Sequence, residues 1–125
     1  MDLPYLNPYL DSIGAPTFEK GCNFAVAGST IRKATADAFS PFSFDVQVAQ
    51  FIRFKNRVLD LQHQGMTLDK CFPATGDVFQ KALYPFDIGQ TDTTSAFNSN
   101  TSDEVSSIPT ILAVFEDGIK DLNNL

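Results

Sequence analysis

Apolar side chains recur at helical spacing between Phe44 and His63, with charged side chains between them. The recurring apolar residues are Val48, Phe51, Ile52, Val58 and Leu59. This spacing places them on one face of an α-helix, so the pattern predicts a helix over residues 44–63. Gly65 follows at a position where a left-handed residue commonly ends a helix.

A second helical pattern occupies the C-terminal segment. Its apolar face comprises Val105, Ile108, Leu112, Phe115, Ile119 and Leu122. Thr101 and Glu104 have the spacing of a capping box, in which a hydroxyl accepts a bond from the third helical N–H and a carboxylate reaches back. Because Pro109 lacks an N–H, the segment is expected either to kink there or to form two helices.

Two short apolar stretches predict strands. Residues 22–28, CNFAVAG, fit a buried strand that ends in a tight turn at Gly28. Residues 77–89 are expected to change from a helix to a strand near Leu83–Ile88, with Pro85 at the strand start or edge. The alternation of helix-like and strand-like segments indicates an α/β fold. Two strands alone would leave sheet faces and edges uncovered, so we expect part of a domain rather than a whole one.

The composition is that of one folded globular domain. The chain has 125 residues, of which 43% are apolar and 19% charged, and twelve Phe residues supply material for a core. A formal charge of −6 argues against binding to nucleic acid or to anionic membranes, which would need a clustered basic surface. Arg53, Lys55 and Arg57 fit an ordinary solvated helix face. No apolar run approaches the roughly 20 residues that span a bilayer, and residues 1–5 show no signal-peptide pattern.

Residue types alone reveal no complete catalytic constellation. His63 is the single histidine and is expected to be solvated near a helix end. Ser29 lacks the second glycine of a nucleophile elbow, and no lysine stands where a phosphate-binding loop needs one. Residues 87–93 lack the distal glutamate of a calcium loop, and Cys22 and Cys71 cannot form a metal site alone. We therefore expect neither a metal nor a cofactor.

Two separated motifs carry a family resemblance. GCNFAVAGSTI (residues 21–31) and ALYPFDIGQTD (residues 82–92) resemble the second and third sequence blocks of the plant GDSL esterase/lipase family, the SGNH hydrolases. The connecting segments agree in order and spacing, particularly with the nodulin-like and α-fucosidase-like branch. The resemblance implies a three-layer, flavodoxin-like α/β fold with a parallel sheet. It also implies hydrolysis of carboxylic ester substrates by acyl transfer to a serine.

The resemblance assigns two oxyanion-hole positions. In the family, the backbone N–H of the second-block Gly and the side-chain amide of the third-block Asn stabilise the oxyanion. Gly28 matches that Gly, whereas Thr91 replaces that Asn. The Gly-Asp-Ser and Asp-x-x-His blocks would stand before and after this stretch, so no catalytic residue is expected within it. Residues 1–125 are expected to form one partial domain with an incomplete parallel sheet, in which Asp92 shapes a turn by accepting local N–H bonds.

The cysteines and one sequon bear on localisation. Cys22 and Cys71 are expected to be buried free thiols, or a disulfide if the protein is exported. The family is extracellular, where the N-glycosylation sequon at Asn100 would be used. If Met1 is the true start, the missing export signal predicts an intracellular protein instead.

Three functional hypotheses follow. The first is an ester hydrolase segment that is inactive alone, because losing the nucleophile or base costs about 10⁶ in rate, against about 10²–10³ for one oxyanion donor. The second is a non-catalytic interaction module that associates with itself through an exposed sheet edge. The third is a truncated product without a function.

Overall fold

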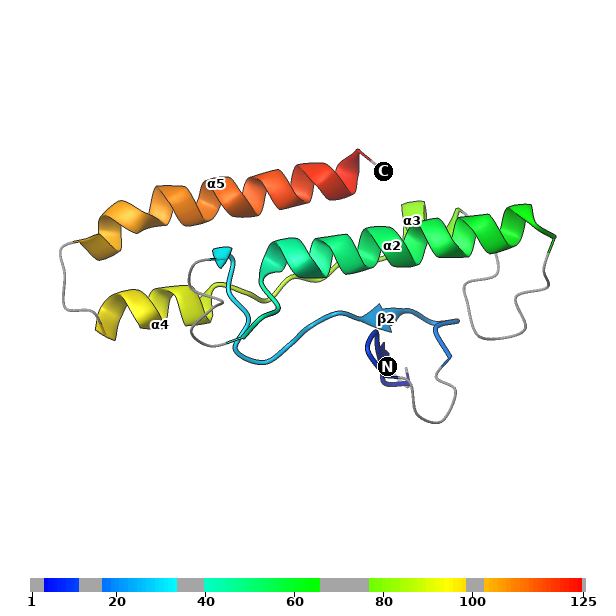
Figure 1. Cartoon of the computed structure of the whole chain (residues 1–125), viewed down its shortest axis with the longest axis horizontal. Coiled ribbons are helices and arrows are strands. Elements are labelled where there is room, and N and C mark those ends of the chain that lie inside the picture. The colour runs from blue at the N-terminus through cyan, green and yellow to red at the C-terminus, as the bar shows by residue number, and fades with distance from the viewer. Residues whose placement is uncertain (1–3, 12–16, 34–39, 66–76, 99–102, 125) are drawn as a thin grey trace. The chain divides into compact units, whose positions relative to one another are not determined.

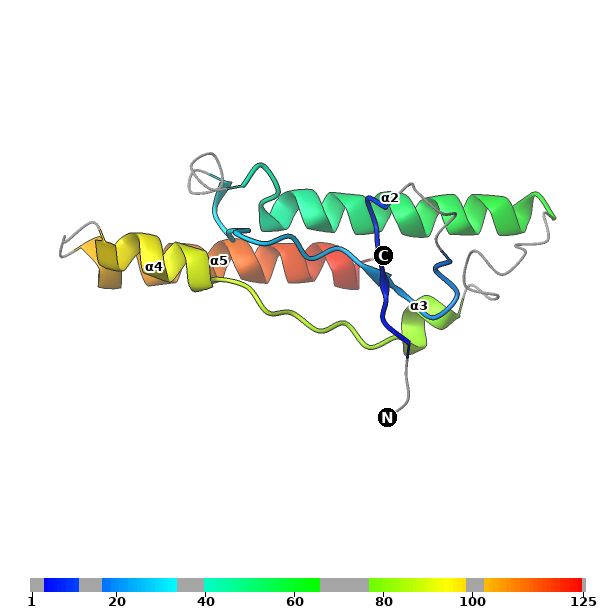
Figure 2. The same cartoon turned by 90° about the horizontal axis from the view of Figure 1, so that it is seen from below.

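The computed structural model describes residues 4–11, 17–33, 40–65, 77–98 and 103–124 (Figures 1 and 2). The chain divides into two compact units. The first unit comprises Met1–Phe24 and Gln50–Tyr84, and the second comprises Ala25–Ala49 and Pro85–Leu125. The boundary between them falls inside helix α2 (Phe44–His63), so this helix supplies residues to both units.

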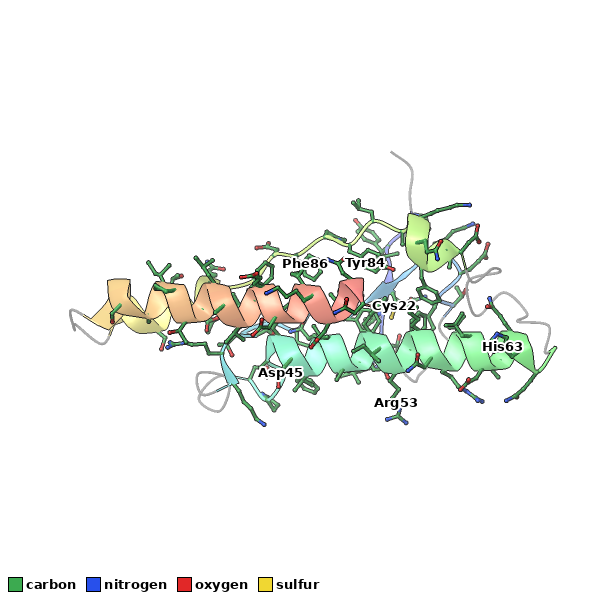
Figure 3. The ribbon with its side chains drawn as sticks, turned by 90° about the horizontal axis from the view of Figure 1, so that it is seen from above. Cys22, Asp45, Arg53, His63, Tyr84 and Phe86 are labelled. Atoms are coloured by element: carbon green, nitrogen blue, oxygen red, sulfur yellow. The ribbon has the colours of Figure 1, made fainter. Side chains whose placement is uncertain are left out.

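Helix α2 confirms the prediction made from its apolar spacing, since it begins at Phe44 and ends at His63. Its buried residues are Phe44, Val48, Phe54, Val58 and Leu61. Arg53, which lies between Val48 and Phe54 in the sequence, is exposed (Figure 3). Gly65 has a φ of 67°, the left-handed conformation that ends a helix at low cost only in glycine.

An aromatic cluster forms the core of the first unit. Phe54, Val58 and Phe79 are buried at its centre, and Tyr9, Phe18, Cys22, Phe24, Phe51 and Val78 pack around them. The Phe54 ring meets those of Phe18, Phe24 and Phe79 edge to face, with centroids 5.5, 5.9 and 6.2 Å apart. This arrangement is favourable because the positive edge of one ring meets the negative face of the next.

Two short strands lie beside this core. Strand β1 (Asn7–Pro8) pairs in parallel with β2 (Cys22–Asn23), and Tyr9 N donates a 2.8 Å hydrogen bond to Asn23 O. The strand predicted over residues 22–28 is therefore real but only two residues long. Beyond Asn23, no described segment offers backbone partners that would continue the ladder.

The strand predicted at Leu83–Ile88 is wrong. Helix α3 (Val78–Lys81) is present, but residues 82–89 that follow it have no regular secondary structure. An apolar sequence forms a strand only where a neighbouring backbone can pair with it, and no described segment pairs with this one. A side chain fixes part of the segment instead: the Tyr84 hydroxyl donates to Phe79 O at 2.7 Å, and burial raises the pKa of Tyr84.

The second unit is helical. Helices α4 (Gln90–Asn98) and α5 (Asp103–Asn123) pack against each other and run antiparallel (Figures 1 and 2). Phe44, in the first turn of α2, contacts Phe86 and Phe115 with ring centroids 5.9 and 5.1 Å apart. Phe86 and Phe115 also contact each other at 5.9 Å, so the three rings form a closed triad.

Helix α5 continues through Pro109, so the alternative of two separate helices is wrong. Proline removes one backbone donor and crowds the preceding turn, and this loss is confined to the N-terminal part of a helix of 21 residues. The predicted capping box lies outside the residues whose side chains are described, because Thr101 and the Glu104 side chain are not placed.

The described part of the chain is thus helix-rich with one short parallel strand pair. This combination is consistent with an α/β fold whose sheet is incomplete.

Gly118 generates a prediction about the packing of α5. A Cβ added there would overlap the edge of the Phe44 ring, including Cδ1 at 3.0 Å. Although Gly to Ala within a helix normally stabilises by about 1 kcal/mol, we expect Gly118→Ala to lower the free energy of unfolding by about 1–3 kcal/mol through overpacking. Urea unfolding followed by circular dichroism measures this difference.

Thr110→Ala, at an exposed position of the same helix, is the control and should leave stability unchanged or slightly raised. Combining Gly118→Ala with Phe44→Leu should recover part of the loss, because the ring edge is removed. A Gly118→Ala variant more stable than the original chain would contradict this packing.

Candidate functional site

Gly28 lies at the tip of a tight turn in the second unit. Ser29 N donates to Val26 O at 3.2 Å, and Gly28 has a φ of 75°. Positive φ at the third residue of a turn is what a type II turn requires, and glycine adopts it without a steric cost. The turn predicted at Gly28 is therefore confirmed. Among the described residues, no acceptor pairs with the Gly28 N–H, and the residue is exposed.

The residues after this turn are held by α2. Thr30 is completely buried, and its carbonyl accepts a 2.8 Å hydrogen bond from Phe44 N. The Thr30 hydroxyl donates to Arg32 O at 2.9 Å. Gln47 Nε2 donates to Ser29 Oγ at 2.9 Å, directly beside Gly28. The segment that carries the Gly28 N–H is thus fixed by both backbone and side-chain bonds.

Gly89 allows the third sequence block to approach the second closely. It has a φ of 103°, and a Cβ there would lie 3.2 Å from Ile31 Cδ1. The Gly89 carbonyl accepts from Thr93 N at 3.0 Å, which begins helix α4. A larger residue at position 89 would both strain the backbone and push Ile31 away.

Thr91 is the second residue of α4, and not part of a loop after a strand as the sequence suggested. It is half-buried, and its hydroxyl makes no hydrogen bond within the part of the chain that the structure describes. Thr93, one position further along in the same turn, differs: its hydroxyl donates to the Gly89 and Gln90 carbonyls. Of these two threonines, Thr91 is therefore the one whose hydroxyl stays available to a ligand.

Asp92 joins the two sequence blocks. Its side chain is 0% exposed, Oδ2 accepts from Ile31 N at 2.7 Å, and Oδ1 accepts from Arg32 N at 3.1 Å. The Arg32 guanidinium adds a charge partner, with Nε 3.7 Å from Oδ1. Acceptance of backbone N–H bonds was expected, but the expectation of local partners was wrong, since Ile31 is 61 positions away. Nothing in the sequence spacing pointed to Ile31 or Arg32.

The other functional candidates considered from the sequence do not take part in this arrangement. His63 is exposed in the last turn of α2, as expected for a solvated histidine (Figure 3). In the described ranges, no three acidic, His or Cys side chains gather closely enough to hold a metal ion. No helix found there has the length and apolar character to cross a membrane.

The predicted disulfide and glycosylation site fall partly or wholly outside the described residues. Cys22 is half-buried in the first unit without a disulfide partner among the described residues, and Cys71 is not described. Asn100 is likewise not described. The Cys22 to Cys71 pairing and the Asn100 modification therefore stay predictions.

Comparison with known proteins identifies close relatives of the chain. A family model described as GDSL-like Lipase/Acylhydrolase matches residues 2–125. Two GDSL esterase/lipases of Arabidopsis thaliana are 56% and 52% identical, each over 98% of this chain and over 30% and 32% of their own lengths. GDSL esterase/lipase ENOD8 of Medicago truncatula is 40% identical over 98% of the chain and 33% of its own length. The chain spans about a third of the length of these relatives, and no solved structure matches it.

Cys22 supports a prediction about thiol reactivity. Burial raises the pKa of the Cys22 thiol from 9.0 to about 12. The folded chain therefore favours the neutral thiol, and ionisation of Cys22 destabilises the fold. The stabilising contribution of the neutral thiol is present below pH 9 and is lost as the pH rises toward 12. Because the thiolate is the reactive form, we expect Cys22 in a reduced Cys71→Ser variant to react with Ellman's reagent at pH 8 at least tenfold more slowly than in urea. Equal rates in both conditions would contradict the assigned burial.

Proposed function

This chain belongs to the family of GDSL-like lipases and acylhydrolases, and on that premise we propose that it supplies the oxyanion-binding part of a carboxylic ester hydrolase. The resemblance of its second and third sequence blocks predicted this family. The names of its relatives as esterases and lipases support ester substrates.

One observation carries the proposal. Two hydrogen-bond donors without partners among the described residues, the Gly28 N–H and the Thr91 hydroxyl, lie on segments that Asp92 ties together. When a nucleophile attacks an ester carbonyl, negative charge develops on the carbonyl oxygen. Donors fixed in advance stabilise that charge without reorganising during the reaction.

The chemistry requires further groups. In the proposed reaction a serine Oγ attacks the acyl carbon while a histidine takes its proton, and the tetrahedral intermediate collapses as the alcohol leaves with that proton. Water then releases the acid from the acyl-enzyme by the same steps. The 125 residues contain no Gly-Asp-Ser motif. Their single Asp-x-x-His sequence, Asp60 to His63, lies at the end of helix α2, where His63 is exposed. We therefore propose that the nucleophile and its base come from polypeptide outside these residues.

The proposed complete fold is the three-layer α/β arrangement of the SGNH hydrolases. The parallel pairing of β1 with β2 supports this arrangement, because the sheet of such a fold is built from parallel strands. Taken alone, the 125 residues are proposed to be inactive.

Thr91 is the weaker of the two donors. An asparagine amide reaches further from the backbone than a threonine hydroxyl, so Thr91 is proposed to supply only part of the stabilisation that the amide gives. Loss of a full oxyanion donor costs about 10²–10³ in rate, which sets the upper limit for the effect of this substitution.

An interaction module is the second candidate function. In the first unit, Tyr5, Leu6 and Leu83 are large apolar residues with exposures of 102%, 45% and 89%. Exposed apolar side chains favour association with a partner chain.

A chimera tests the proposed function. Residues 2–125 replace the matching segment of the Arabidopsis relative that is 56% identical, and hydrolysis of p-nitrophenyl butyrate is compared with that of the parent. We expect an active chimera, in which Thr91→Val lowers kcat by about tenfold, whereas Thr91→Asn keeps or raises it. Gly28→Ala retains the N–H but strains the turn, because Gly28 has a φ of 75°, so it should displace this donor and lower kcat by up to about 10². The isolated 125 residues should be no faster than their denatured form.

Thr94→Val is the matched control, because it makes the same change at an exposed position of α4. An active chimera that tolerates Thr91→Val as well as Thr94→Val would remove Thr91 from the reaction.

The interaction hypothesis predicts self-association of the isolated chain. Size-exclusion chromatography with light scattering should show a dimer or larger species that Leu83→Ser shifts toward monomer. A monodisperse monomer across the micromolar range would rule this hypothesis out, and heterogeneous aggregates insensitive to Leu83→Ser would also count against it.

A further inference from the structure

We infer that Asp92 is a positioning residue, which fixes the Gly28 and Thr91 donors relative to each other through its bonds to the backbone of Ile31 and Arg32. This inference rests on the proposed function of these two donors. It assigns to Asp92 a part in the reaction that requires no contact with the substrate.

The connection between the donors is short. Asp92 is the next residue after Thr91 in helix α4, and Ile31 follows Gly28 by three positions. The 2.7 Å bond from Ile31 N to Asp92 Oδ2 thus joins two segments that are 61 residues apart in sequence. Without it, the position of one donor relative to the other would depend on weaker side-chain packing such as that of Ile31 against Gly89.

Both carboxylate oxygens are used in this connection. Oδ2 accepts from Ile31 N, and Oδ1 accepts from Arg32 N at 3.1 Å and lies 3.7 Å from Arg32 Nε. Two acceptors that bind two consecutive N–H donors resist rotation of one segment against the other, which a single bond would permit. The carboxylate is the side chain of this length that accepts at both positions, since asparagine would turn its NH₂ group toward one of the N–H donors.

The burial of the carboxylate supports a positioning role. Asp92 is 0% exposed, and removing a charged group from water is costly even when it is paired. A buried ionic group is a weak means of stabilising a fold, but its directional bonds define one geometry. Catalytic donors need such definition, because they must be held within about 0.5 Å of the productive arrangement.

The pairing also limits the effect of the charge on the reaction. An unpaired carboxylate beside an oxyanion hole would oppose the negative charge that develops there. Two N–H dipoles and the Arg32 guanidinium face the Asp92 oxygens and offset this repulsion. The same groups that position the segment therefore make its charge tolerable.

Asp92→Asn and Asp92→Ala in the chimera test the inference. Active sites are first titrated with a fluorophosphonate, so that rates refer to folded enzyme only. We expect kcat for p-nitrophenyl butyrate to fall about tenfold in Asp92→Asn and about 10² in Asp92→Ala, with KM changed less than twofold. The inhibition constant of an alkyl boronic acid, which becomes a tetrahedral anion on the serine, should rise in parallel with the loss in kcat.

Asp87→Ala is the matched control, because Asp87 is an exposed acid five positions earlier in the same segment. It should leave kcat, KM and boronic acid inhibition unchanged. If Asp92→Ala does not yield folded protein, Asp92→Asn carries the test, because it keeps one of the two bonds.

Three outcomes would overturn the inference. A kcat per titrated site that is unchanged in the Asp92 variants, with only the yield or unfolding midpoint reduced, would make the residue purely structural. A rise in KM equal to the loss in kcat/KM would assign it to substrate binding instead. An inactive chimera with Asp92 intact would remove the proposed function, and the inference with it.

Discussion

Packing of aromatic rings against one helix is the interaction on which both units depend. Helix α2 contributes Phe54 and Val58 to the core of the first unit and Phe44 to the aromatic triad of the second. The described residues contain only one short strand pair, so sheet hydrogen bonds add little to this core. Burial of large rings, each worth roughly 150–250 Å² of removed surface, supplies the main driving force instead.

The features of the fold that could be predicted from the sequence are those that local patterns determine. The spacing of apolar residues predicted the bounds of α2, and the glycine after CNFAVA predicted the turn at Gly28. Both features follow from periodicity or from the backbone freedom of glycine, which a single stretch of sequence carries. Family membership was reached in the same way, from motifs within short stretches.

The errors concern features that depend on distant partners. The apolar run at Leu83–Ile88 has the composition of a strand, yet it has no paired neighbour among the described residues. Thr91 was expected on a loop because a strand was predicted before it, whereas helix α4 begins at Gln90, directly after the point where Gly89 approaches Ile31. The partners of Asp92 could not be predicted either, since a carboxylate in a turn-like sequence is equally suited to near and distant N–H groups.

The long sequence separation between Asp92 and Ile31 has a consequence for how the unit folds. A bond across 61 residues closes a long loop, and the entropy of that closure must be offset by other contacts first. Helix α2 depends on backbone contacts between residues four positions apart, so it can form before this loop is closed. We therefore expect the two oxyanion segments to be joined late in folding, after the helices have formed.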